Sequence, residues 1–214
     1  MWGEPIHSNF FGSARGGSVN ICDTNVFGYG FSPLDLEYLI LPHCHHDHYP
    51  GLPQLLFYRR MRQRDRDGLR PLKIIGPAKD LERVVKLSRD LLLADRFPDV
   101  DHVPEVVPLS PGDRFECPTF HLETCNTIHA LRGLCYRYGD PGGTDFGFTG
   151  DTAYHPPIAR FLKDCPFIVH EAAHGLRQVE NARESGHSSA EDAARIAKDA
   201  QAIDWAWFTS KKRM

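Results

Sequence analysis

The sequence predicts a single layered domain of mixed helices and strands, of the α/β class with α+β layering. Strand-type and helix-type segments alternate along the chain, without internal repeats or low-complexity linkers. The length of 214 residues suits one domain, spanning 1–214, that can bury a substantial core. Hydrophobic residues make up 41% and charged residues 25%, which is ordinary for a globular protein.

The first half of the chain is expected to contain short strands and two helices. Residues 1–38 are rich in Gly, Ser and Asn and predict one or two strands before a helical turn with Ser32 as its N-cap. Apolar runs then predict strands, and apolar residues at helical spacing predict helices. The expected segments are a strand at Leu39–Leu41, a helix at Gly51–Arg66, a strand at Pro71–Pro77 and a helix at Asp80–Asp95.

The second half is richer in strands, and its turns carry clear signals. Pro111-Gly112 and Asp140-Pro141-Gly142-Gly143 are typical of the connections between antiparallel strands. The expected strands are Glu105–Leu109, Arg114–Glu116, Thr119–Thr124, Leu134–Tyr138, Phe146–Thr149, Phe167–Val169 and Trp205–Phe208, and the expected helices are Pro157–Leu162 and Ser189–Ala200.

Charge and cysteine usage limit the function classes. A net charge of −3 provides no overall attraction to nucleic acid, so such binding would need a local basic patch. The N-terminal residues do not have the pattern of a signal peptide, and no stretch approaches the ~20 apolar residues of a membrane span. Six cysteines lack C-x-x-C pairing, which favours reduced thiols in a cytoplasmic protein. The lack of a long apolar stretch predicts no membrane partner.

A dense cluster of histidines follows the predicted strand at Leu39–Leu41. Within six residues the chain carries His43, His45, His46, Asp47 and His48. Imidazole and carboxylate groups at the end of a strand suit Zn, Fe or Mn. The alternatives are a solvated polar turn or a purification tag, but the internal position and the interleaved Asp47 argue against a tag. Cys44 is expected to be a packed thiol.

His43-x-His45-x-Asp47-His48 resembles the H-x-H-x-D-H signature of the metallo-β-lactamase superfamily. The resemblance implies an αββα sandwich with one or two metals at one edge of its two sheets. His129 and Asp151 match the third and fourth ligand blocks of that superfamily. It further implies that His43, His45 and His129 hold one metal, and that Asp47 and His48 hold a second, with Asp151 bridging. Zinc is the expected divalent metal, with Mn or Fe as alternatives. Paired cations of this kind activate a bridging solvent molecule for attack on a substrate.

The C-terminal third is similar to the ribonuclease Z family of tRNA 3′-processing enzymes. Val169–Ala172 and Gly186–Ala194 resemble its "HEA" and "H-S/T-x-A-x-x-A-A" blocks, and Pro71–Pro77 resembles one of its strands. The resemblance implies catalytic roles for Asp47, His187 and Glu171, with Glu171 orienting His187 for proton transfer. In the alternative, His187 is only the neighbour of a helix start: Ser188 and Ser189 open a helix whose N-terminus could itself hold a phosphate. Ser188 is a candidate substrate contact.

Two departures from the ribonuclease Z pattern bear on the substrate. Ser210 stands where a histidine is expected, which leaves open whether the second metal site fills; no spacing argument selects His46 or His174 as a replacement. The segment between His129 and Asp151 is too short for a tRNA-gripping arm. RNA would then need the arginine-rich segment 59–70, with Arg59, Arg60 and Arg62 as candidate contacts, or that segment is only a solvated helix end.

Three functions therefore remain as hypotheses. The first is a metal-dependent phosphodiesterase that cleaves RNA or a small phosphodiester. The second is a hydrolase of the same superfamily that opens lactones, thioesters or β-lactams. The third is a degenerate, metal-poor binding module. The sequence leaves open the exact substrate, the metal and whether the chain forms a homodimer.

Overall fold

The computed structural model describes residues 32–63, 69–176 and 179–208, which form two compact units that meet in sequence at Pro108 and Leu109. The strands expected within residues 1–31, and Ser210, lie outside the described residues. No helix in the described ranges is long and apolar enough to cross a membrane.

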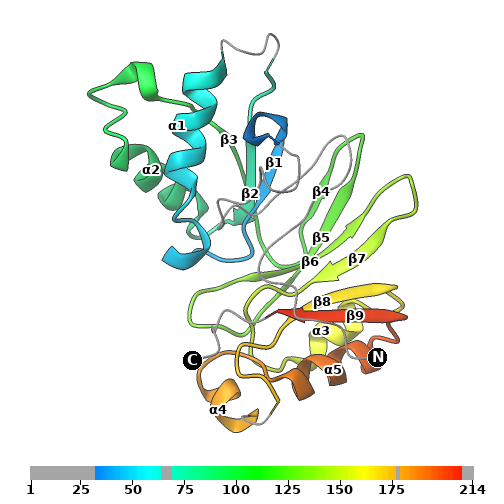
Figure 1. Ribbon diagram of the computed structural model, residues 1–214. Coiled ribbons are helices and arrows are strands. Elements are labelled where there is room, and N and C mark those ends of the chain that lie inside the picture. The colour runs from blue at the N-terminus through cyan, green and yellow to red at the C-terminus, as the bar shows by residue number, and fades with distance from the viewer. Residues whose placement is uncertain (1–31, 64–68, 177–178, 209–214) are drawn as a thin grey trace. The chain divides into compact units, whose positions relative to one another are not determined.

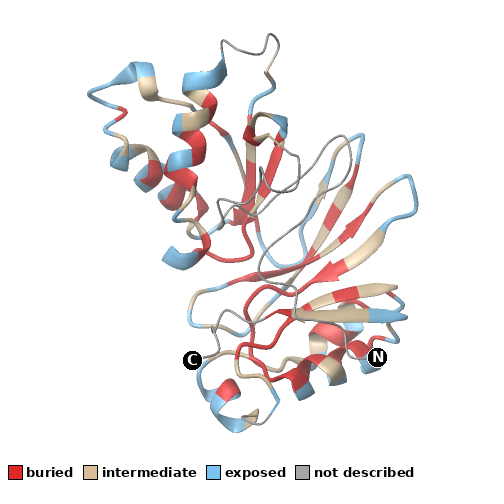
Figure 2. Ribbon diagram, in the orientation of Figure 1, coloured by how far each residue is buried: buried red, intermediate tan, exposed pale blue. Residues whose placement is uncertain are grey.

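The first unit is a three-stranded sheet with two helices (Figure 1). Its sheet order is β1-β2-β3, and β1 and β2 are parallel with Leu39 opposite Ile74. The helices α1 and α2 pack against each other, and their buried residues join those of the strands in one apolar core. Figure 2 shows the buried side of both helices in red and their exposed side in blue. The elements are β1 (Tyr38–Ile40), α1 (Leu52–Arg62), β2 (Lys73–Pro77), α2 (Leu81–Leu91) and β3 (Glu105–Leu109).

The second unit is a six-stranded sheet in the order β4-β5-β6-β7-β8-β9 (Figure 1). Strands β4 to β7 form an antiparallel meander, and β8 and β9 add to it in parallel. The helices α3 and α5 pack together, and their apolar residues share a core with β6 and β8. The strands are β4 (Arg114–Glu116), β5 (His121–Asn126), β6 (Leu134–Gly139), β7 (Asp145–Phe148), β8 (Phe167–Glu171) and β9 (Asp204–Phe208), and the helices are α3 (Pro156–Phe161), α4 (Val179–Glu184) and α5 (Ala190–Asp199).

The strand directions in this sheet gather several loops at one edge. Because β6 is antiparallel to both β5 and β7, strands β5 and β7 run in the same direction, and β8 and β9 are parallel to them. The carboxyl ends of these four strands therefore lie at one edge of the sheet. The loops that follow β5, β7 and β8 begin there and carry His129, Asp151 and Ala173.

The predicted elements agree with the structure, and most boundaries shift by a few residues. Every strand expected between residues 39 and 208 is present, as are the four helices and the Ser32-capped turn at Pro33–Asp35. Helix α4 was not predicted, because its six residues are too short for an apolar stripe to stand out.

Arg59 has a structural role, which corrects its prediction as a substrate contact. Its side chain is completely buried in the first unit. Its Nη1 donates to the carbonyl oxygens of Pro33 at 2.9 Å and Leu36 at 2.8 Å, and its Nη2 donates to that of Arg70 at 2.7 Å. The guanidinium therefore ties three backbone segments together and is not available to a phosphate. Arg60 is also engaged, since its Nε donates to the carbonyl oxygen of Asp99 at 2.8 Å.

Replacing Arg59 with leucine should strongly destabilise the chain. Arg59→Leu leaves the buried carbonyl groups of Pro33 and Leu36 and the part-buried carbonyl group of Arg70 without their donor, and each unmet buried group costs roughly 1–3 kcal/mol. We expect the free energy of unfolding to fall by at least about 3 kcal/mol in a urea titration. The matched control is Arg62→Leu, one turn further along α1 at an exposed position, which should change it by less than about 0.5 kcal/mol. Equal losses in both variants would contradict the role given to Arg59.

Candidate metal site

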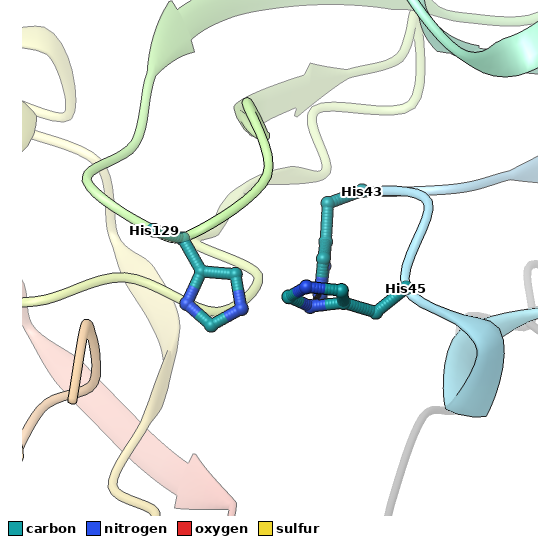
Figure 3. A group of neighbouring side chains, drawn as sticks. All are labelled: His43, His45 and His129. Carbon is teal, nitrogen blue, oxygen red and sulfur yellow. Dashed lines mark hydrogen bonds between the residues drawn. The ribbon is translucent and has the colours of Figure 1, made fainter.

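His43 and His45 lie on the segment that leaves β1, and their ring nitrogens face each other (Figure 3). The His43 Nε2 and His45 Nδ1 atoms are 3.0 Å apart, and the two rings meet edge to face. Two imidazole nitrogens that bind one tetrahedral zinc at about 2.0–2.1 Å lie about 3.3 Å apart. The spacing of this pair is therefore close to what a shared cation requires.

Asp47 and His48, the last two residues of the H-x-H-x-D-H motif, lie on the next turn, a short 3-10 helix at His46–His48. His48 is buried, and its ring centroid is 4.0 Å from that of His43. Asp47 is exposed, and its Oδ2 lies 3.8 Å from the His48 Nε2. His46 points to solvent. As expected, Cys44 packs in the core of this unit, where burial raises the pKa of its thiol to about 12.

In the second unit, His129 lies on the loop that follows β5 (Figure 3). Its Nδ1 donates to the carbonyl oxygen of Gly186 at 2.7 Å. That bond fixes the tautomer and the ring orientation, and it leaves Nε2 as the nitrogen suited to a cation.

Gly186 is required at its position for two reasons. Its φ of 76° lies in the left-handed region, which side chains rarely adopt. A Cβ added there would also come within 3.3 Å of the His129 Nδ1. The glycine therefore lets the backbone approach the His129 ring closely enough to bond to it.

Asp151 lies three residues beyond the end of β7 and is buried. One ligand atom each from His129, Asp151 and His187 lie within 4.8 Å of one another. Two imidazoles and a carboxylate form a donor set that suits Zn, Mn or Fe. The described residues of this unit thus fit a divalent cation. His187, predicted as a proton carrier, is also placed where it can serve as a ligand.

Glu171 ends β8 with its carboxylate almost fully buried. Its Oε1 accepts from the backbone N–H of Thr152 at 2.7 Å and from the His187 Nδ1 at 2.9 Å. Its Oε2 accepts from the backbone N–H of Ala173 at 3.0 Å. The same His187 nitrogen is 3.9 Å from the Asp151 Oδ2. With Nδ1 donating to Glu171, His187 can take up or release a proton at Nε2.

Ser188 has a structural contact, which corrects its prediction as a substrate contact. Its side chain is fully buried, and its hydroxyl donates to the carbonyl oxygen of Thr152 at 2.7 Å. The N-terminus of α5 is capped instead by Ser189, whose Oγ accepts from the backbone N–H of Asp192 at 3.1 Å. The Asp192 carboxylate returns to the N-cap and occupies this helix end with negative charge, which disfavours an anion there.

His174 lies beside this group on the turn after β8. Its Nε2 is 3.0 Å from the Ser185 Oγ, and its ring centroid is 6.2 Å from that of His187. His170 is fully buried; its Nδ1 donates to the carbonyl oxygen of Glu171 at 2.7 Å, and burial lowers its pKa.

Thr152 is a site residue that the sequence did not reveal. Its hydroxyl accepts from the backbone N–H of Ile128 at 3.0 Å, so it joins the loop of His129 to that of Asp151. Its backbone N–H bonds to Glu171 and its carbonyl to Ser188. A single threonine after an aspartate does not indicate this role in the sequence. Gly186, in contrast, belongs to the segment Gly186–Ala194 that resembles a ribonuclease Z block.

Comparison with known proteins shows the family of this chain. Residues 21–205 match the family model described as anti-Pycsar protein Apyc1. The chain belongs to the Apyc1 family. The sequence alone pointed to the superfamily and to ribonuclease Z, but not to this family.

Individual relatives of this Apyc1-family chain include metallo-hydrolases. It is 27% identical to the probable metallo-hydrolase YhfI of Bacillus subtilis over 81% of this chain and 66% of YhfI. It is 24% identical to ribonuclease Z of Methanococcus maripaludis over 78% of this chain and 68% of that protein. The chain thus spans about two thirds of the length of these curated relatives.

Solved structures show the fold of the Apyc1-family chain. YhfI from Bacillus subtilis, a metallo-β-lactamase fold protein, matches with a TM-score of 0.75 and 23% identity, over 96% of this chain and 80% of that one. The short form of human tRNase Z, ELAC1, matches with a TM-score of 0.73 and 17% identity, over 97% and 91%.

The predicted fold class and the predicted relationship to ribonuclease Z are therefore confirmed. The chain is a metallo-β-lactamase fold protein related to metallo-hydrolases, and this fold implies binding of a divalent metal.

Replacing Glu171 with its amide should destabilise the second unit. Glu171→Gln turns one acceptor oxygen into an NH2 donor. In the Oε2 position this group would face the backbone N–H of Ala173, and in the Oε1 position it would face the donors of Thr152 and His187. An unmet buried group costs roughly 1–3 kcal/mol, so we expect a loss of this size in the free energy of unfolding. The control Glu184→Gln, at the exposed end of α4, should stay within about 0.5 kcal/mol. An unchanged denaturation midpoint for Glu171→Gln would contradict this assignment.

Proposed function

We propose that the chain is a metal-dependent phosphodiesterase that acts on a small phosphodiester. The observation that carries the proposal is the His187–Glu171 pair, which lies beside Asp151 and His129 in the second unit. Cleavage of a phosphodiester must protonate a leaving alkoxide, and a histidine held by a buried carboxylate suits that task. The ribonuclease Z relationship supports phosphorus chemistry over other hydrolyses.

The ligand set predicted from the sequence is part of this proposal. His43, His45 and His129 would hold one divalent cation, and Asp47, His48 and Asp151 would contribute to a second. Zinc is the first choice, because His and Asp ligands suit it, with Mn or Fe as alternatives. Bound cations of this kind lower the pKa of water and neutralise charge that builds on phosphoryl oxygens. Asp47 is proposed to take part in catalysis as well as in metal binding.

His187 is proposed to protonate the substrate, and Glu171 orients its ring. Glu171 accepts a hydrogen bond from the His187 Nδ1 and so holds the ring in one tautomer. His187 can then deliver a proton from Nε2 to the departing oxygen. The Gly186 carbonyl holds His129 in the same way, so both rings are oriented before substrate binds.

A small substrate is favoured over a whole tRNA by two observations. The residues between His129 and Asp151 are taken up by a short loop, β6, a tight turn and β7, which leaves no gripping arm. Arg59 is buried and Arg60 bonds to the backbone, so two of the three candidate arginine contacts are engaged within the fold. RNA as a partner, a cytoplasmic location and a homodimer remain predictions.

The test combines metal content with a substrate panel. We expect metal in the protein purified without chelator, and hydrolysis of bis(p-nitrophenyl) phosphate, a dinucleotide and cyclic mononucleotides, with little activity on lactones. Activity on lactones alone would favour a hydrolase that opens lactones, thioesters or β-lactams. No metal, with no uptake of Zn or Mn, would favour a binding module.

Two variants separate the proposed roles. His129→Ala should lose bound metal and activity together, whereas the control His121→Ala, on β5, should keep both. His187→Asn should keep its metal and lose roughly 10²-fold or more in kcat, with the limb of the pH profile that reports this group abolished. Loss of metal in His187→Asn would instead identify His187 as a ligand.

A further inference from the structure

Two cysteines face each other across the β5–β6 ladder. Cys125 and Cys135 occupy directly opposite positions of these antiparallel strands. Opposite residues in such a pair have Cα atoms about 4.5–5.5 Å apart, inside the range of about 4.4–6.8 Å that a disulfide bridges. Both are free thiols in this structure. The backbone therefore already holds them at a distance suited to a covalent bond.

The two thiols differ in exposure and are in contact. Cys135 is fully buried, and burial and then a hydrogen bond with the Cys125 thiol raise its pKa well above the usual value. Cys125 is partly exposed, and its Sγ also donates to the carbonyl oxygen of Asn126 at 3.6 Å. An oxidant from solvent would therefore meet Cys125 first, and Cys135 occupies the opposite position on the next strand.

A third thiol near the pair is engaged elsewhere. Cys165 is buried, and burial raises its pKa to about 11. Its Sγ donates to the carbonyl oxygen of Phe167 at 3.4 Å and lies 3.6 Å from the Asp145 Oδ1. Cys165 is therefore less suited than Cys125 to form a disulfide with Cys135.

The pair stands at the base of the loop that carries His129. Strand β5 ends one residue after Cys125, and β6 begins one residue before Cys135. Between them, residues 127–133 form the loop, closed by a bond of 3.3 Å from the Thr127 N–H to the Gly133 carbonyl. A bond between the two sulfurs would close the loop covalently at the same place.

We propose that Cys125 and Cys135 form a reversible disulfide that fixes the base of the 127–133 loop when the chain meets a peroxide. This modification of the chain does not depend on the proposed hydrolysis.

The chemistry balances with hydrogen peroxide as the oxidant. The Cys125 thiolate attacks one peroxide oxygen, the O–O bond breaks, and a sulfenic acid and hydroxide form. The Cys135 sulfur then attacks the Cys125 sulfur, the S–O bond breaks, and the leaving hydroxide takes up the proton from Cys135. Two thiols thus yield one disulfide, and peroxide is reduced to two waters. A dithiol reductant reverses the step by thiol–disulfide exchange.

The experiment maps disulfides by mass spectrometry after treatment of the full chain with hydrogen peroxide. We expect a linked peptide pair that joins Cys125 to Cys135 and disappears with dithiothreitol. The variant Cys125→Ser should form no such link. Its matched control is Cys117→Ser, also partly exposed but outside the ladder pairing, which should form the link as the wild type does.

Hydrogen exchange of residues 127–133 provides a second readout that needs no substrate. Exchange should slow in oxidised wild type and not in oxidised Cys125→Ser, because the bond prevents the strand ends from opening. A link between Cys135 and Cys165, or no link at all, would overturn the proposed site. Unchanged exchange in linked protein would overturn its control of the loop.

Discussion

The hydrogen bonds of the buried Glu171 carboxylate hold together the candidate metal site of the second unit. It receives the backbone N–H groups of Thr152 and Ala173 and the ring N–H of His187. A carboxylate removed from water is stable only when hydrogen bonds replace its hydration, and here three donors do so. The need to satisfy one charge therefore brings together the segments after β7 and β8 and the loop before α5.

Strand direction explains why these segments are within reach of one another. The antiparallel meander returns the chain so that β5 and β7 end at the same edge, and the parallel additions β8 and β9 end there too. Ligand blocks that are far apart in sequence become neighbours for this reason. A register shift of one residue in β7 would turn its side chains to the other face and displace Asp151.

Much of this could be predicted from residues with strong local signals. The Asp140–Gly143 turn defined a hairpin, and the spacing of His43, His45, Asp47 and His48 indicated both metal binding and the superfamily. Residues whose roles arise from tertiary contacts could not be predicted. In the sequence Arg59 is one arginine among several, whereas in the structure its buried side chain donates to three carbonyl oxygens. Ser188 was predicted as a substrate contact, but its hydroxyl donates to the carbonyl oxygen of Thr152. A sequence pattern identifies the type of a side chain, but it does not show whether that side chain is already hydrogen-bonded within the fold.

The loop before α5 is held on both sides of His187. The N–H groups of Gly186 and His187 bond to the carbonyls of Arg183 and Ala182, and the next two residues are fixed by the Ser188 hydroxyl and the Ser189 cap. The conformational entropy of this loop is therefore lost when the chain folds and not when a substrate arrives. Binding energy is then not consumed in ordering the His187 ring, which is the thermodynamic advantage of a preorganised site.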